Sequence, residues 1–318
     1  MKNFLFFIDN HFLKSDSNSV WGTLESELQR QAINYKAVFI SDNRHIGDLL
    51  KKALNNTEDK DNIVVVSVGP STLFLDILAK LRKNNKKKVP IAFILINEKN
   101  NFATKIGVSS NPVTALKQIL NSVHPTSYNL GLVENVQGTN EQIFTDELIV
   151  GFSAYVTSLI KSSKFYSLLV KYHLTLIAEF CAMTDAFINQ EAFSVTTRLS
   201  QKYNFFKSSF SIHVKNQPFL DDENSAEPNN LQLEIITNLN PFSYWFVILA
   251  RKFKLTSKVP FVHSFEQKKI HLVINSLEFS QIDNRQLINK FYDAYLKSFS
   301  YPFWFDVDSV SISEKSNS

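Results

Sequence analysis

The feature that most constrains the fold is the run Ile-Val-Val-Val-Ser-Val at residues 63–68. A continuous β-branched run without polar alternation is typical of a parallel strand that is buried on both faces. Parallel strands need crossover connections, which are usually helices. The run therefore predicts an α/β domain in which helices cover both faces of a parallel sheet.

Strand and helix patterns alternate at short spacing through the first 122 residues. The expected elements are strands at 3–9, 35–40, 63–68 and 89–96 and helices at 24–33, 46–54, 72–81 and 112–120. Asn111 is the expected N-cap of the last helix, with Pro112 at its first position, where proline is favoured. We predict a doubly wound, Rossmann-like α/β domain over residues 1–124.

The pattern changes near His124. From residue 125 to about residue 310, most segments alternate with period two or are apolar between polar turns, which is typical of antiparallel strands. The expected elements include strands at 193–197, 210–214, 231–236 and 270–274, one long helical stretch at 155–186 and a polar loop at 218–230. We predict a mainly antiparallel β domain over residues 125–318, a β-sandwich with inserted helices.

The composition limits the class of protein, its cellular compartment and its binding partners. Hydrophobic residues make up 44% of the chain, and no apolar stretch reaches the ~18 residues of a membrane-spanning helix. Cys181 is the single cysteine, which excludes a disulfide framework and a thiolate metal site and favours a cytoplasmic protein. The basic cluster at residues 80–88 fits either a solvated helix end or a patch for anionic lipid head groups. Nucleic-acid binding is not expected, because the basic residues are not interleaved with aromatic ones.

Glycine is scarce. The chain has seven glycines, whereas average usage of ~7% would give about 22. Nucleotide-binding loops use glycine where backbone N–H groups close around phosphate. The chain therefore has little material for such loops, and it also has no G-x-x-x-x-G-K-[ST] motif.

Three segments carry a family resemblance. Residues 94–108 read Ile-Leu-Ile-Asn-Glu-Lys-Asn-Asn-Phe-Ala-Thr-Lys-Ile-Gly-Val, residues 68–72 read Val-Gly-Pro-Ser-Thr, and residues 148–154 read Leu-Ile-Val-Gly-Phe-Ser-Ala. In order and spacing they resemble the motifs I-P-x-G-T-x-N-D-F-A-R-x-L-G-I, G-G-D-G-T and G-I-G-F-D-A of bacterial diacylglycerol kinases and related lipid kinases. The resemblance extends over most of the chain and implies the two-domain fold of that family.

Such kinases transfer the γ-phosphate of ATP, with magnesium, to a hydroxyl of diacylglycerol or a similar lipid. The resemblance implies nucleotide-binding positions at Ser41, Gly69, Thr72, Glu98, Asn100 and Asn101. Asp306 and Asp308 lie where the family has D-G-E, so the resemblance implies that one of them is the general base. The alternative is two solvated acids near the end of the chain.

The motifs also depart from the family in ways that bear on catalysis. Pro70 has no N–H to offer a phosphate, and Glu98 brings a negative charge where the family has a neutral hydroxyl. Asn229 and Asn230 stand near the family's D-G-x-L turn, so the acid implied to help hold magnesium is absent there. Together these losses argue against ordinary ATP-dependent turnover.

Two functions follow from the sequence. One is an ATP-dependent lipid kinase with altered catalysis, whose cofactors would be ATP and magnesium. The other is a non-catalytic lipid-binding or regulatory pseudokinase on the same fold. Both fit a cytoplasmic protein with peripheral membrane contact, and a homodimer fits the resemblance because pairing of β domains is common in this family.

Overall fold

The computed structural model describes a defined set of residues, namely 2–10, 20–41, 45–56, 62–84, 88–98, 100–136, 141–199, 201–220, 228–238, 240, 243, 246, 259–283 and 285–309. The chain divides into two compact units. Unit 1 comprises Met1–Asn129, Pro218–Glu227 and Ser300–Ser318, and unit 2 comprises Leu130–Gln217 and Pro228–Phe299.

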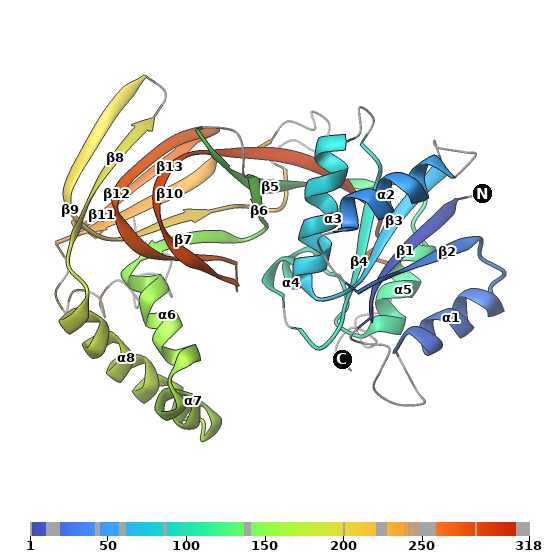
Figure 1. Ribbon diagram of the computed structural model, residues 1–318, viewed down its shortest axis with the longest axis horizontal. Coiled ribbons are helices and arrows are strands. Elements are labelled where there is room, and N and C mark those ends of the chain that lie inside the picture. Colours follow the sequence, from blue (N-terminus) through green and yellow to red (C-terminus); the bar gives the residue numbers. More distant parts are fainter. Residues whose placement is uncertain are drawn as a thin grey trace. The chain divides into compact units, whose positions relative to one another are not determined.

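Unit 1 is an α/β unit, as predicted (Figure 1). Its elements are the strands β1 (Asn3–Asp9), β2 (Tyr35–Ile40), β3 (Ile63–Gly69) and β4 (Ile91–Leu95) and the helices α1 (Val20–Arg30), α2 (Ile46–Asn55), α3 (Ser71–Asn84), α4 (Asn101–Ile106) and α5 (Pro112–Leu120). The strands pair in parallel in the order β2-β1-β3-β4. Every residue of β3 and β4 is buried, which confirms the prediction from the β-branched run. Asn111 caps α5 by accepting hydrogen bonds from the N–H groups of Val113 and Thr114.

The end of the chain belongs to unit 1, whereas the strand pattern predicted one domain over residues 125–318. The cause is β13 (Arg285–Phe303), whose last residue pairs in parallel with Ile91 of β4. The Tyr301 hydroxyl donates to the Val89 carbonyl oxygen at 2.9 Å. Burial raises the pKa of Tyr301, so its phenol keeps the proton that this bond requires.

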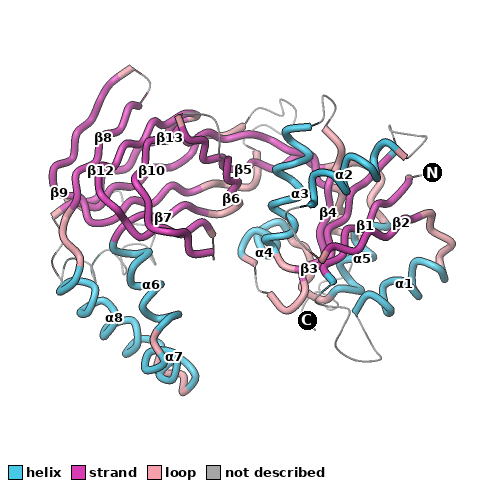
Figure 2. The backbone as a smooth tube through the Cα atoms, in the orientation of Figure 1, coloured by secondary structure: helices cyan, strands magenta, loops and turns pink. Residues whose placement is uncertain are grey.

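Unit 2 is mainly antiparallel β, also as predicted. Its elements are the strands β5 (Thr126–Asn135), β6 (Glu141–Phe144), β7 (Glu147–Gly151), β8 (Phe193–Leu199), β9 (Lys202–Lys215), β10 (Leu231–Thr237), β11 (Val262–Gln267), β12 (Lys269–Ile282) and most of β13, and the helices α6 (Phe152–Ser162), α7 (Lys164–Lys171) and α8 (Thr175–Asn189). β7 and β8 both lie between β9 and β12, but they pair with different parts of these two strands (Figure 2). β7 pairs with residues 211–215 of β9 and 280–282 of β12, whereas β8 pairs with residues 202–209 and 270–274.

The β strands of unit 2 enclose one core. The strand order is β11-β10-β9-β7-β12-β13, followed by β5 and β6. Phe144 of β6 and Leu233 of β10 belong to the same hydrophobic cluster although their strands are far apart in this order. The strands therefore form one connected sheet around this core, and the β-sandwich stays a prediction.

The helix predicted over residues 155–186 is three helices. Ser163 ends the first of them, and its hydroxyl accepts the Tyr166 N–H at 3.5 Å at the start of α7. His173 has a φ of 61° between α7 and α8, which breaks the helical path. Residues 221–227 of the predicted polar loop lie outside the described residues, and those on either side of them have no strand.

Gly151, between β7 and α6, provides a test of this fold. Its φ is 87°, and a Cβ atom there would lie 2.4 Å from the Phe210 carbonyl oxygen. Gly151→Ala should therefore lower the free energy of unfolding by about 2–4 kcal/mol, as measured by urea denaturation. Gly47→Ala is the control, because a Cβ atom there would meet its nearest neighbour, Lys80 Cδ, at 3.6 Å. The control should leave stability unchanged or raise it by up to ~1 kcal/mol, and equal losses in both variants would contradict the fold.

Candidate functional site

The predicted nucleotide-binding residues gather at one edge of the unit 1 sheet. Ser41, Gly69 and Glu98 lie at or just beyond the carboxyl ends of β2, β3 and β4, and Asp9, which was not among the predicted residues, ends β1. The strand order changes direction at β1, since β2 lies on one side of it and β3 on the other. Ligands of open α/β sheets bind outside the carboxyl ends of strands at such a switch point.

Glu98 and Ser71 make the central contact of this edge. The Ser71 N–H donates to Glu98 Oε2 at 2.7 Å, and the Ser71 hydroxyl donates to Glu98 Oε1 at 2.6 Å. Ser71 is the first residue of α3, so its N–H is one of the donors that a helix leaves unpaired at its start. Helix N-termini bind phosphate and carboxylate groups through such donors. The Glu98 carboxylate therefore occupies an anion position at this turn.

The other residues of the turn, from Gly69 to Thr72, provide few hydrogen-bond donors for a second anion. Pro70 has no N–H, and its own carbonyl oxygen accepts the Leu73 N–H at 3.1 Å. Gly69 lies so close to β1 that a Cβ atom there would be 3.0 Å from Asp9 Cβ. Thr72 is half-buried in the first turn of α3. The structure thus places Gly69 and Thr72 around a turn whose first amide already has a carboxylate partner.

Asn100 and Asn101 begin α4. Asn100 is its N-cap, and the side-chain oxygen accepts the Ala103 N–H at 3.0 Å. Both asparagines line a pocket of about 460 Å³ together with Glu98 and Thr104. Asn100 therefore has a structural role in the helix, and the nucleotide-binding role of the pair stays a prediction.

Asp306 and Asp308 form a turn beside the end of α4. Asp306 Oδ1 accepts the N–H groups of Asp308 and Ser309, at 3.2 and 3.1 Å. Gln118 ties this turn to α4, because its side-chain nitrogen donates to the carbonyl oxygens of Gly107 and Val307. Asp306 thus stabilises the turn and Asp308 is exposed, and the role of either as general base stays a prediction.

Ser41 links two strand ends. It is exposed, and its hydroxyl accepts a hydrogen bond of 2.5 Å from the side chain of Asn10, which follows β1. Ser71 was not among the residues that the sequence predicted for the site. The available signal was a hydroxyl residue directly after a proline at the start of a helix, two positions beyond the family-like Gly69.

The expected cofactors can be tested against these contacts. Both donors of Ser71 bind Glu98, so a phosphate of ATP could use them only by displacing that carboxylate. Over the part of the chain that the structure describes, no three His, Cys, Asp or Glu side chains group as a metal site. Binding of the ATP and magnesium that the family resemblance implies therefore stays a prediction.

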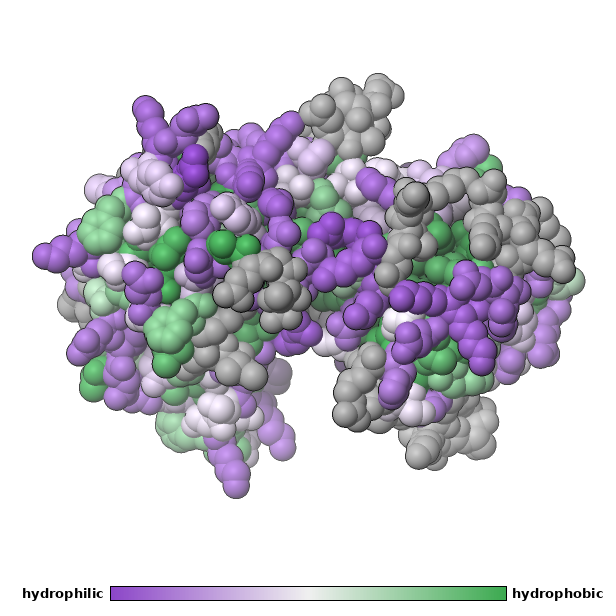
Figure 3. Space-filling model, turned by 45° about the horizontal axis from the view of Figure 1, so that its top comes forward, coloured by the Kyte–Doolittle hydropathy of each residue, from purple (hydrophilic) through white to green (hydrophobic). Residues whose placement is uncertain are grey.

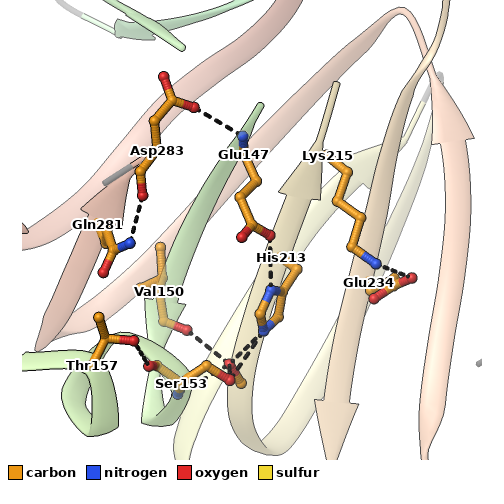
Figure 4. A network of polar contacts seen from close by, with 10 residues as sticks. Glu147, Val150, Ser153, Thr157, His213, Lys215, Glu234, Gln281 and Asp283 are labelled. Carbon is orange, nitrogen blue, oxygen red and sulfur yellow. Dashed lines mark hydrogen bonds and ion pairs between the residues drawn. The ribbon is translucent and has the colours of Figure 1, made fainter. Parts of the chain in front are cut away.

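The third family-like segment lies in unit 2, in a buried polar network (Figure 4). His213 Nε2 is 3.0 Å from the Ser153 hydroxyl, and His213 Nδ1 is 3.4 Å from a carboxylate oxygen of Glu147. A hydroxyl, an imidazole and a carboxylate in this order can activate a serine. Ser153 and His213 are only 7% and 2% exposed, however, so the network joins β7, β9 and α6 and is closed to a substrate. Asp283 supports it by accepting hydrogen bonds from the backbone of Asp146 and Glu147.

Comparisons with solved structures show which known proteins have a similar fold. No family model matches the chain, and no curated protein matches it by sequence. By structure it is similar to a candidate diacylglycerol kinase from Bacillus anthracis strain Sterne, with 13% identity, a TM-score of 0.67 and coverage of 97% of this chain and 99% of that one. A diacylglycerol kinase from the same strain gives 12% identity, a TM-score of 0.60 and coverage of 97% and 98%.

The chain has the fold of these diacylglycerol kinases. This confirms the resemblance at the level of the fold. Within the diacylglycerol-kinase fold, the turn from Gly69 to Thr72 is the one that the resemblance assigns to the nucleotide. The contact of Glu98 with Ser71 lies at this turn.

Replacing Glu98 tests the contact. Glu98→Ala should lower the free energy of unfolding by about 1–2 kcal/mol in urea denaturation, because the first amide of α3 loses a charged acceptor. Glu98→Gln should lose about half as much, since its amide oxygen can still accept. The control is Asp48→Asn, an exposed acid in the first turn of α2, which should cost only a few tenths of a kcal/mol. A Glu98→Ala variant no less stable than this control would show that the contact is absent in solution.

Proposed function

We propose that this chain is a non-catalytic, lipid-binding protein built on the diacylglycerol-kinase fold, in which Glu98 closes the phosphate-binding turn. The observation that carries the proposal is the two-point contact of the Glu98 carboxylate with the Ser71 N–H and hydroxyl. The lipid ligand is supported by the similarity of fold to proteins described as diacylglycerol kinases.

Competition for the same donors explains why ATP would be excluded. A phosphate at this turn would need the two Ser71 donors, and hydrogen bonds to charged groups contribute ~1.5–3 kcal/mol each. A displaced Glu98 carboxylate would remain next to the triphosphate, and two unit charges 4 Å apart near a protein surface repel by roughly 4 kcal/mol. Pro70 cannot supply a replacement donor. The turn at the start of α3 therefore favours the Glu98 carboxylate over a phosphate of ATP.

Catalysis would also need a positioned base. Phosphoryl transfer depends almost entirely on positioning and electrostatic stabilisation of the phosphates. One carboxylate oxygen of Asp306 accepts hydrogen bonds from the backbone of its own turn, and Asp308 is exposed. These contacts support a protein that keeps the fold without the phosphoryl-transfer chemistry.

Thermal unfolding with ATP and magnesium distinguishes the proposal from an active lipid kinase. A nucleotide at 100 times its Kd would stabilise the protein by ~2.7 kcal/mol and raise Tm clearly. We expect no rise for the wild type at millimolar ATP. We expect a small rise for Glu98→Ala, in which the Ser71 donors are released, and none for the control Asp48→Asn. A rise in the wild type, together with transfer of labelled phosphate to diacylglycerol, would overturn the proposal.

Retention of labelled diacylglycerol in detergent micelles tests the lipid half separately. The protein should carry the label through gel filtration without ATP, and the Glu98→Ala variant should carry as much. If neither protein retains the label above the level of empty micelles, the lipid-binding role is wrong even where ATP is excluded.

A further inference from the structure

The helices α6, α7 and α8 of unit 2 leave many apolar side chains in solvent. They extend away from the curved sheet of that unit (Figure 1). We use the name apolar tip for the seven side chains on α7, α8 and their connection that are between 43% and 70% exposed, namely Phe165, Leu168, Tyr172, Leu174, Leu176, Ile177 and Phe180. Every residue from Val170 to Ile177 is exposed.

The helices already have a core on their other side. α8 turns Ala178, Ala182 and Ala186 inward, where they pack with Phe152 and Val156 of α6. The outward side of α8 exposes Leu176, Ile177 and Phe180 near its start, whereas Thr184, Asp185 and Asn189 are exposed near its end. Contiguous exposed apolar side chains mark interaction surfaces. The side chains of the apolar tip are therefore expected to be covered by a partner outside the core of unit 2.

The charges around the tip indicate which environment. From Leu148 to Phe180 the sequence has three lysines, Lys161, Lys164 and Lys171, and one acid, the half-buried Glu179. All three lysines are exposed. On the face drawn in Figure 3, apolar and polar side chains lie next to one another at the lower end of the helical part of unit 2. Apolar side chains flanked by lysines are typical of helices that lie in the interface of an anionic membrane.

We propose that the apolar tip docks unit 2 onto an anionic lipid bilayer. The tip enters the region between head groups and acyl chains, and the three lysines contact the anionic head groups. No described helix is long and apolar enough to cross a bilayer, so the contact is peripheral. A second copy of the chain is the poorer occupant, because a two-fold contact through the tip would bring the same lysines of both copies together.

This inference rests on the lipid-binding half of the proposed function and names the surface by which the protein reaches its lipid. Residues of unit 1 take no part in it. Vesicles without diacylglycerol therefore test the docking alone, whereas retention of diacylglycerol in micelles tests the lipid ligand. A failure of one can be told from a failure of the other.

Vesicle co-sedimentation with the full chain is the experiment. The probes are vesicles of phosphatidylcholine and phosphatidylglycerol in equal parts, and vesicles of phosphatidylcholine alone. The wild type should bind the anionic vesicles, and its affinity should fall as salt is added. Replacing the three lysines by glutamine should weaken binding by about a hundredfold to a thousandfold, since each lysine contributes about a factor of five to ten at an anionic surface.

Two further variants separate the apolar contribution from a loss of folding. Leu176→Ser with Ile177→Ser removes two exposed side chains of the tip and should weaken binding by at least about tenfold. Phe205→Ser is the matched control, because Phe205 is 66% exposed on β9, outside the tip. It should bind like the wild type.

Three results would overturn the docking proposal. The wild type could stay in the supernatant with anionic vesicles. The Leu176→Ser, Ile177→Ser variant could bind them as tightly as the wild type. That variant could also halve the particle mass in sedimentation velocity while vesicle binding stays unchanged, which would show that a second copy covers the tip.

Discussion

One carboxylate joins two turns of unit 1 that are 27 residues apart in the sequence, the turn from β3 to α3 and the turn from β4 to α4. Glu98 can reach Ser71 because β3 and β4 are adjacent parallel strands whose carboxyl ends meet at the same edge. The Ile96 N–H reinforces this alignment by donating to the Gly69 carbonyl oxygen at 3.2 Å. The contact pairs the first amide of α3 with a fixed internal anion, so the turn is stable without a ligand.

The fold and the chemistry of this edge are held by different interactions. The fold depends on strands that are buried on both faces and on the return of the chain at Phe303 to the edge strand β4. Neither requires a glycine-rich loop. A sequence poor in glycine can therefore keep the diacylglycerol-kinase fold, while both donors of Ser71 bind a carboxylate of the protein itself. The apolar tip lies in unit 2 and is independent of these losses.

Local signals in the sequence predicted much of the fold. The β-branched run predicted β3, and Asn111 with Pro112 predicted the start of α5, because each depends on neighbouring residues alone. The pairing of Phe303 with Ile91 joins strands about two hundred residues apart in the chain and leaves no local pattern. The predicted second domain therefore included residues 300–318, which belong to unit 1. The break at His173 was missed because the segments around it are equally apolar and helical in pattern.

The sequence predicted that the candidate site residues lie together, but it did not predict their contacts. Gly69, Glu98 and Asn100 do lie at one edge of the sheet, and the motif marked Glu98 as an acid where the family has a neutral hydroxyl. It could not show that this charge binds Ser71, since that depends on how two turns face each other in space. It also did not show that the Asn100 side chain caps α4, a role that asparagine fulfils at many helix starts.

The most direct test of the closed turn is the amide resonance of Ser71 in a two-dimensional 1H–15N spectrum, recorded while inorganic phosphate is added. A carboxylate that holds this amide predicts a strongly downfield proton that does not shift with phosphate in the wild type and moves upfield in Glu98→Gln. A Ser71 amide that shifts saturably with phosphate in the wild type would show that the turn is open to an external anion, and it would contradict the account.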